Sequence, residues 1–169
     1  MGIEPLQLAG AVFVGIGAAL IMDLWNLFLL RTFNISSLSF CVVGRWLSYM
    51  LLGTFTHSNI AAAPKRPAEC AIGWVAHFLT GVTFALMLVI LTSGRWLEHP
   101  SLLPALLVGV GTVVIPYCLV QPALGLGVAS AKTPHPTQAR LKSFMTHTVF
   151  GVGLYLSAIP WSYLVHAAF

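Results

Sequence analysis

The chain has 169 residues, of which 58% are hydrophobic and only 7% are charged, and its formal net charge is +4 at pH 7. Soluble domains carry about 25% charged residues, so this chain has too little polar surface to fold as a globule in water. The composition therefore predicts an integral membrane protein. The positive charge does not predict nucleic-acid binding, because the basic residues are confined to expected loops and helix ends, where they orient membrane proteins.

Four apolar stretches are long enough to cross a bilayer, which requires roughly 20 residues per helix. A shorter apolar run follows the first stretch and is interrupted by Arg45, so we expect a helix at the membrane interface rather than a fifth span. The pattern predicts an all-α, single-domain membrane protein in contact with the lipid bilayer. The expected spans cover about 6–30, 70–91, 102–127 and 141–164, and the interfacial helix covers about 38–52.

The basic residues predict the orientation of the spans. They gather in the first and third connections, whereas the second connection holds only Arg95. Because cytoplasmic loops carry an excess of Lys and Arg, we expect these two connections in the cytoplasm and both termini in the periplasm. The residues that set this expectation are Arg31, Arg45, Lys65, Arg66, Lys132, Arg140 and Lys142.

The three cysteines, Cys41, Cys70 and Cys118, form no CxxC pair and are odd in number. This spacing is typical neither of a disulfide framework nor of a zinc site. We therefore expect three free thiols in apolar or interfacial surroundings.

Two patterns recur in the same order and predict an internal duplication. Val-Gly-x-Gly occurs at 14–17 in the first span and at 108–111 in the third, and His-x-x-x-Gly-Val occurs at 77–82 in the second span and at 147–152 in the fourth. Two tandem helical hairpins would place the two histidines at similar depth on facing helices. Small residues allow helices to approach closely, and the expected packing positions are Gly15, Gly73, Gly81, Gly109 and Gly151.

Polar residues gather in the expected cytoplasmic half of the spans. Asp23 is the only aspartate of the chain, and Tyr117 occupies the equivalent position in the predicted repeat. Ionisable groups in a bilayer usually face the interior of the bundle, where a charged Asp23 needs a partner such as Arg45 or a protonated histidine. The predicted buried polar site consists of Asp23, His77, His147, Gln121, Tyr117 and Arg45.

Three interpretations of this site stay open. In the first, hydrogen bonds between helices only fix the packing, and the protein is an accessory subunit. In the second, the histidines and Asp23 take up and release protons for small-solute transport, and four short helices then require a homo-oligomer or a larger complex. In the third, His77 and His147 ligate a haem, or hold a divalent metal together with Asp23. Familiar catalytic motifs are absent from the sequence, so we do not expect an enzyme.

Motifs spread over nearly the whole chain carry a resemblance to a known family. They are Met22-Asp23-Leu24-Trp25, Gly44-Arg45-Trp46, His57 with Ile60-Ala61, Gly73-Trp74 with His77, Gln121-Pro122, and the run from His147 to Leu156. The chain resembles an uncharacterised bacterial family of four-span membrane proteins that carry a domain of unknown function (DUF2938-like). The resemblance implies a bacterial inner-membrane location, and it implies no activity, cofactor or residue role.

Overall fold

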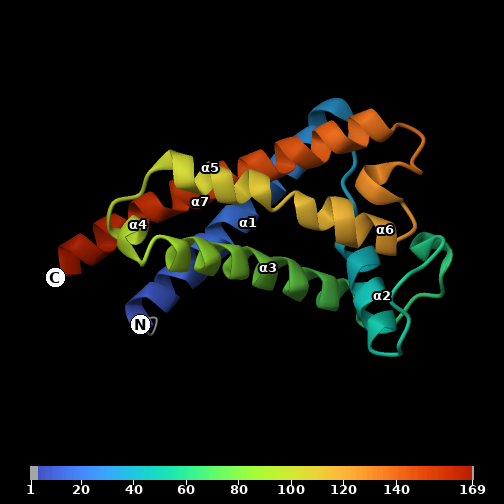
Figure 1. Ribbon diagram of the computed structural model, residues 1–169, viewed down its shortest axis with the longest axis horizontal. Coiled ribbons are helices and arrows are strands. Elements are labelled where there is room, and N and C mark those ends of the chain that lie inside the picture. The colour runs from blue at the N-terminus through green and yellow to red at the C-terminus, as the bar shows by residue number, and fades with distance from the viewer. Residues whose placement is uncertain (1–3, 169) are drawn as a thin grey trace. The chain divides into compact units, whose positions relative to one another are not determined.

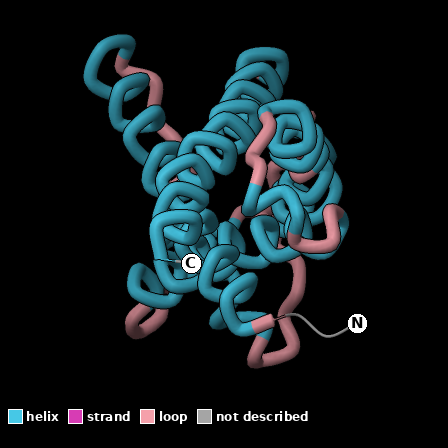
Figure 2. Tube along the Cα trace, turned by 90° about the vertical axis from the view of Figure 1, so that its left-hand side faces the viewer, coloured by secondary structure: helices cyan, strands magenta, loops and turns pink. Residues whose placement is uncertain are grey.

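The computed structural model of the chain describes residues 4–168, and within them it consists of helices and loops without a strand (Figures 1 and 2). Four helical segments are long and apolar enough to cross a membrane. They are α1 (Pro5–Phe33), α3 (Glu69–Leu91), the segment Leu102–Ala123, and α7 (Pro136–Ala168). The all-α prediction and the four predicted apolar spans are therefore confirmed. The short helix expected after the first span is α2 (Phe40–Met50).

The third span is not one continuous α-helix. Its first part is α5 (Leu102–Gly111), which is followed by a π-helical turn, η2 (Pro116–Val120), and then by α6 (Gln121–Ala123). A proline has no N–H to donate, so the prolines at 116 and 122 each remove a helical hydrogen bond. The α-helical ladder therefore cannot continue unchanged, and the chain widens into the π-helical turn at this point.

The fourth span begins earlier than the sequence indicates. We expected its first residue near 141, after a basic loop, whereas α7 begins at Pro136. Proline is favoured in the first turn of a helix because the N–H that it lacks would have no helical partner there. Arg140 and Lys142 therefore lie on the helix itself and not in the loop before it.

The residue contacts divide the chain into two compact units, each described separately. Unit 1 comprises Met1–Ile35, Phe78–Thr112 and Thr146–Phe169, and unit 2 comprises Ser36–His77 and Val113–Met145. Helices α3 and α7 each contribute one end to unit 1 and the other end to unit 2. The single-domain description of the chain stays a prediction.

Unit 1 packs α1, α5, the short helix α4 (Arg95–Glu98) and parts of α3 and α7 around one apolar core. Its helices approach so closely that added methyl groups would collide with the neighbouring backbone. A Cβ on Gly15 of α1 would lie 2.8 Å from the carbonyl carbon of Gly81 in α3. A Cβ on Gly109 of α5 would lie 2.5 Å from the amide nitrogen of Gly151 in α7. The core residues are Ala11, Val14, Ala18, Ala85, Leu88, Val89, Trp96, Leu97, Ala105, Phe150, Leu154 and Ala158.

Unit 2 is organised around α2 and the loop that follows it. The core consists of Trp46, Ile60, Ala123 and Leu124, and the loop also contains η1 (Ile60–Ala62). The Trp46 indole donates to the Phe55 carbonyl at 2.8 Å. The His57 amide donates to the Ala123 carbonyl at 2.8 Å, and the Ile60 amide donates to the Leu124 carbonyl at 3.2 Å. These bonds fix the loop against α6, and the turn η3 (Val128–Ser130) completes the unit.

Candidate functional site

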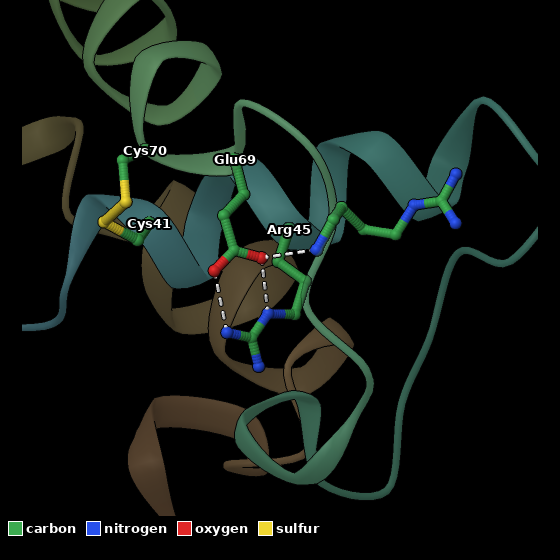
Figure 3. The surroundings of a disulfide bond; sticks show 5 residues. Cys41, Arg45, Glu69 and Cys70 are labelled. Carbon is green, nitrogen blue, oxygen red and sulfur yellow. Dashed lines mark hydrogen bonds and ion pairs between the residues drawn. A yellow bond between two sulfur atoms is a disulfide. The ribbon is translucent and has the colours of Figure 1, made fainter.

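The structure joins Cys41 and Cys70 by a disulfide, so the expectation of three free thiols is wrong for this pair (Figure 3). Each cysteine is the second residue of its helix, Cys41 in α2 and Cys70 in α3. The contact depends on the crossing of these two helices, and a sequence separation of 29 residues gives no sign of it. Cys118 has a free and exposed thiol, as expected.

A buried ion pair lies beside the disulfide (Figure 3). The Arg45 Nε donates to Glu69 Oε2 at 2.8 Å, and Nη2 donates to Glu69 Oε1 at 2.9 Å. Two parallel bonds of this kind use the planar fork of the guanidinium, which a lysine cannot reproduce. The hydrogen bonds that Arg45 donates to Glu69 raise the pKa of Arg45 above its ordinary value, so the charge persists despite burial. The sequence offers Arg45 or a protonated histidine as a partner for Asp23, and the ion pair that the structure shows for Arg45 is with Glu69.

The same ion pair holds the end of the loop in place. The remaining Arg45 nitrogen, Nη1, lies within 3.3 Å of the Ile60 carbonyl, 3.2 Å of the Ala61 carbonyl and 3.0 Å of the Ala63 carbonyl. The Arg66 amide donates to Glu69 Oε2 at 2.8 Å. Buried carbonyls and amides need such partners, because an unpaired polar group away from water is costly. Arg45 therefore satisfies the backbone of the loop as well as the charge of Glu69.

The backbones of α2 and α3 touch where the disulfide joins them. A Cβ on Gly44 would overlap the Glu69 carbonyl oxygen and would lie 2.6 Å from the Gly73 amide nitrogen. A Cβ on Gly73 would overlap the Phe40 carbonyl oxygen. Gly73 was predicted as a packing position, and its contact in unit 2 is with α2. Glycine is required at this crossing because any side chain would separate the helices.

His147 of the predicted polar site has a defined partner in unit 1. Its Nδ1 lies 2.8 Å from the Thr112 hydroxyl oxygen, and the Thr112 hydroxyl also donates to the Gly109 carbonyl at 2.6 Å. Thr112 is buried, and His147 is half-buried. A Cβ on Gly109 would lie 2.9 Å from the His147 carbonyl oxygen. The close approach of α5 and α7 at this glycine therefore brings the two polar side chains together. Asp23 is half-buried in α1 of the same unit.

His77 belongs to unit 2 and has aromatic neighbours there. Its ring stacks on the Phe40 ring with centroids 4.1 Å apart, and it meets the Trp74 ring edge-on at 5.9 Å. Stacked and edge-on geometries are the favourable ones for aromatic rings. The predicted pairing of His77 with His147 stays a prediction.

Gln121 and Tyr117 also lie in unit 2. The Tyr117 hydroxyl donates to the Arg140 carbonyl at 2.5 Å. Gln121 is buried, and its Oε1 has no hydrogen-bond partner among the described residues. Over residues 4–168, no three His, Cys, Asp or Glu side chains form a group that could hold a metal ion. The metal and haem interpretations therefore gain no support from the geometry.

A comparison with family models identifies the chain. The model described as "Protein of unknown function (DUF2938)" matches residues 12–160. The chain belongs to this family. No curated protein and no solved structure matches it.

The residues matched by the DUF2938 model include every member of the site described above, from Asp23 to His147. The family description assigns no activity, so the function of this DUF2938 protein has to be inferred from its residues. The sequence predicted Arg45 and His147 as site residues, whereas Glu69, Thr112 and the cysteine pair were missed. The missed groups are short-range partners across helix crossings, and a sequence pattern does not show which helices cross.

Proposed function

We propose that this protein is a multi-pass protein of the bacterial inner membrane that moves protons across the bilayer, linked to a small polar solute. The observation that carries the proposal is the hydrogen bond between His147 Nδ1 and Thr112 Oγ1, made between two apolar helices. An ionisable side chain inside a span is costly, and such residues mark proton and ion pathways. Histidine can exchange a proton near neutral pH.

The hydrogen-bond chain at Thr112 defines which ring nitrogen exchanges the proton. A hydroxyl has a single proton, and the Thr112 hydroxyl donates it to the Gly109 carbonyl. Thr112 can then only accept from His147, so Nδ1 has to carry a hydrogen. In neutral histidine the other nitrogen, Nε2, is left as an acceptor. Nε2 of His147 is therefore the atom that takes up and releases the transported proton.

Asp23 is a second ionisable residue in a span of unit 1, and it is half-buried. We infer that Asp23 shares the proton-transfer task, because ionisable residues within spans mark proton and ion pathways. In this proposal Asp23 and His147 each take up a proton from one side of the membrane and release it toward the other side.

The basic residues favour cytoplasmic first and third connections, with periplasmic termini. Large apolar side chains are exposed along α1 and α3, as expected for helices that face lipid or another copy of the chain. A homo-oligomer or a subunit of a larger membrane complex fits the small number of spans.

Proton flux through purified protein in liposomes tests the proposal. A potassium gradient with valinomycin sets a membrane potential, and a pH-sensitive dye inside the vesicles reports proton entry. We expect flux above that of empty liposomes for the wild type, and loss of this excess in His147→Gln and in Asp23→Asn. Both substitutions preserve size and remove the titratable group.

The matched control is His135→Gln, because His135 is exposed and lies outside the helices. This variant should conduct like the wild type. Wild-type flux no greater than that of empty liposomes, or equal flux in all variants, would favour the structural interpretation, in which the polar residues only fix helix packing.

A further inference from the structure

The cysteine pair carries an inference that is independent of proton transport. Cys70 is exposed and Cys41 is half-buried, and the bond between them joins the first turn of α2 to the first turn of α3. A thiol at the N-terminal end of a helix is more acidic than a free cysteine, because the helix dipole favours the thiolate. The exposed member of the pair is therefore placed to react with soluble thiols and disulfides.

The two helices do not depend on the disulfide for their contact. Arg45 in the middle of α2 and Glu69 at the start of α3 also join the two helices through two hydrogen bonds, and Gly44 lies directly against the backbone of α3. Opening the S–S bond therefore leaves the two sulfur atoms close together. Two thiols that stay close together when reduced can form the disulfide again without a large conformational change.

The chemistry of the expected compartment disfavours a permanent disulfide. The first connection, which contains Cys41 and leads to Cys70, carries exposed Lys65 and half-buried Arg66, and its basic residues favour the cytoplasmic side. Thiol systems keep cytoplasmic cysteines reduced, and disulfides formed there are usually transient, catalytic or redox-sensing. This step rests on the orientation proposed above.

We propose that Cys41 and Cys70 form a reversible thiol–disulfide exchange site on the cytoplasmic face, which reacts with a low-molecular-weight thiol and its disulfide. In the oxidising direction, the Cys70 thiolate attacks one sulfur of the small disulfide. A mixed disulfide forms, and one small thiolate leaves. The Cys41 thiolate then attacks the Cys70 sulfur, which closes the Cys41–Cys70 bond and expels the second small thiolate.

The exchange balances in electrons and protons. The pair loses two electrons as its new S–S bond forms, and the small disulfide gains them as its own S–S bond breaks. The two thiol protons of the pair end on the two released small thiols. The reverse reaction, with two small thiols as the reductant, reopens the site.

The redox state in growing cells provides the first test. The Cys118→Ser protein retains only two cysteines, Cys41 and Cys70. Cells that produce it are quenched with acid, and the free thiols are then labelled with a polyethylene glycol maleimide. We expect a gel shift of two labels in untreated cells, loss of that shift after brief treatment with diamide, and its return after the diamide is washed out. A pair that is unlabelled in untreated cells would overturn the proposal.

The chemistry of the first step is tested on purified protein incubated with oxidised glutathione. In a Cys41→Ser, Cys118→Ser protein, Cys70 has no resolving partner, so the glutathione mixed disulfide should accumulate and be visible by intact mass. The Cys70→Ser, Cys118→Ser protein is the matched control and should form less adduct, because Cys41 is less exposed. Equal or greater modification of Cys41 would contradict the assignment of Cys70 as the attacking residue.

The compartment is tested separately with Lys65→Cys placed in a protein whose three native cysteines are serine. Lys65 is exposed in the same loop. A membrane-impermeant maleimide should label this cysteine only after the cells are broken. Labelling in intact spheroplasts would place the loop in the periplasm and make the disulfide a permanent structural bond, which would overturn this proposal while leaving the proton-flux proposal to its own experiment.

Discussion

Arg45 of α2 and Glu69 of α3 neutralise each other in a buried two-point ion pair. This relationship has a consequence for membrane orientation, which depends on basic residues near the ends of the spans. A paired and buried arginine contributes less to the positive surface of the first connection than the sequence suggests. Lys65 and Arg66 are then the residues of this connection that carry the orientation signal, together with the basic residues of the third connection.

Glu69→Gln should strongly destabilise unit 2, because it leaves the Arg45 charge buried without a counter-charge. We expect the midpoint of thermal unfolding in detergent to fall by on the order of 5 °C or more. Arg45→Lys should also lower the midpoint, since a lysine cannot make both bonds to the carboxylate. Tryptophan fluorescence reports the change, because Trp46 lies in the core of this unit.

Lys65→Gln is the control for this experiment, since Lys65 is an exposed charge of the same loop. Its midpoint should match that of the wild type. An unchanged midpoint in Glu69→Gln would mean that the ion pair does not stabilise the contact between the two helices.

Gly109→Ala should weaken unit 1 by about 1–3 kcal/mol, because the added Cβ would overpack the contact between α5 and α7. That Cβ would lie 2.5 Å from the Gly151 amide nitrogen. Gly111→Ala on the same helix is the matched control, since nothing lies within 4 Å of its added Cβ. Equilibrium unfolding in mixed micelles should show a loss for position 109 and none for position 111. Equal effects at both positions would contradict the close approach.

Thr112→Val should change the tautomer of His147 while costing only about 1 kcal/mol of stability. The valine keeps the shape of the threonine but removes the hydroxyl that lies 2.8 Å from His147 Nδ1. Nitrogen-15 NMR of labelled histidine should show a predominantly Nδ1-protonated ring in the wild type and a shift toward the Nε2-protonated form in the variant. The exposed His135 should give the same spectrum in both proteins. A His147 signal that does not respond would remove the basis for assigning uptake and release of the transported proton to Nε2.

Gln121→Met should leave stability unchanged or raise it by about 1 kcal/mol, because the buried Gln121 Oε1 has no hydrogen-bond partner among residues 4–168. The methionine fills a similar volume without a polar atom. Thermal unfolding in detergent measures the effect, and the exposed Gln138→Met is the control. A clear loss of stability would show that the Gln121 amide has a partner in the membrane-embedded protein.

The contacts of unit 1 bear on the predicted duplication. In the predicted repeat, Gly15 corresponds to Gly109 and Gly81 corresponds to Gly151. In the structure Gly15 lies against Gly81, and Gly109 lies against Gly151. Positions that are equivalent in the proposed repeat therefore make equivalent helix contacts. The duplication itself stays a prediction.

The sequence alone determined the all-α class, the four apolar spans and the short helix after the first span. Length and hydropathy are sufficient for this, because each helix in a bilayer must satisfy its own backbone and bury a fixed length of apolar side chains. Local composition therefore accounts for the elements and their approximate ends.

Only the tertiary structure decided which polar groups meet. The Cys41–Cys70 bond, the Arg45–Glu69 pair and the Thr112–His147 bond each join residues that are far apart in sequence. Each lies near a place where a glycine lets the backbones of two helices approach closely. The sequence shows where the glycines and the polar residues lie along the chain, but it does not show which of them come together. The pairing arises only when the close approach of two backbones brings particular side chains into contact.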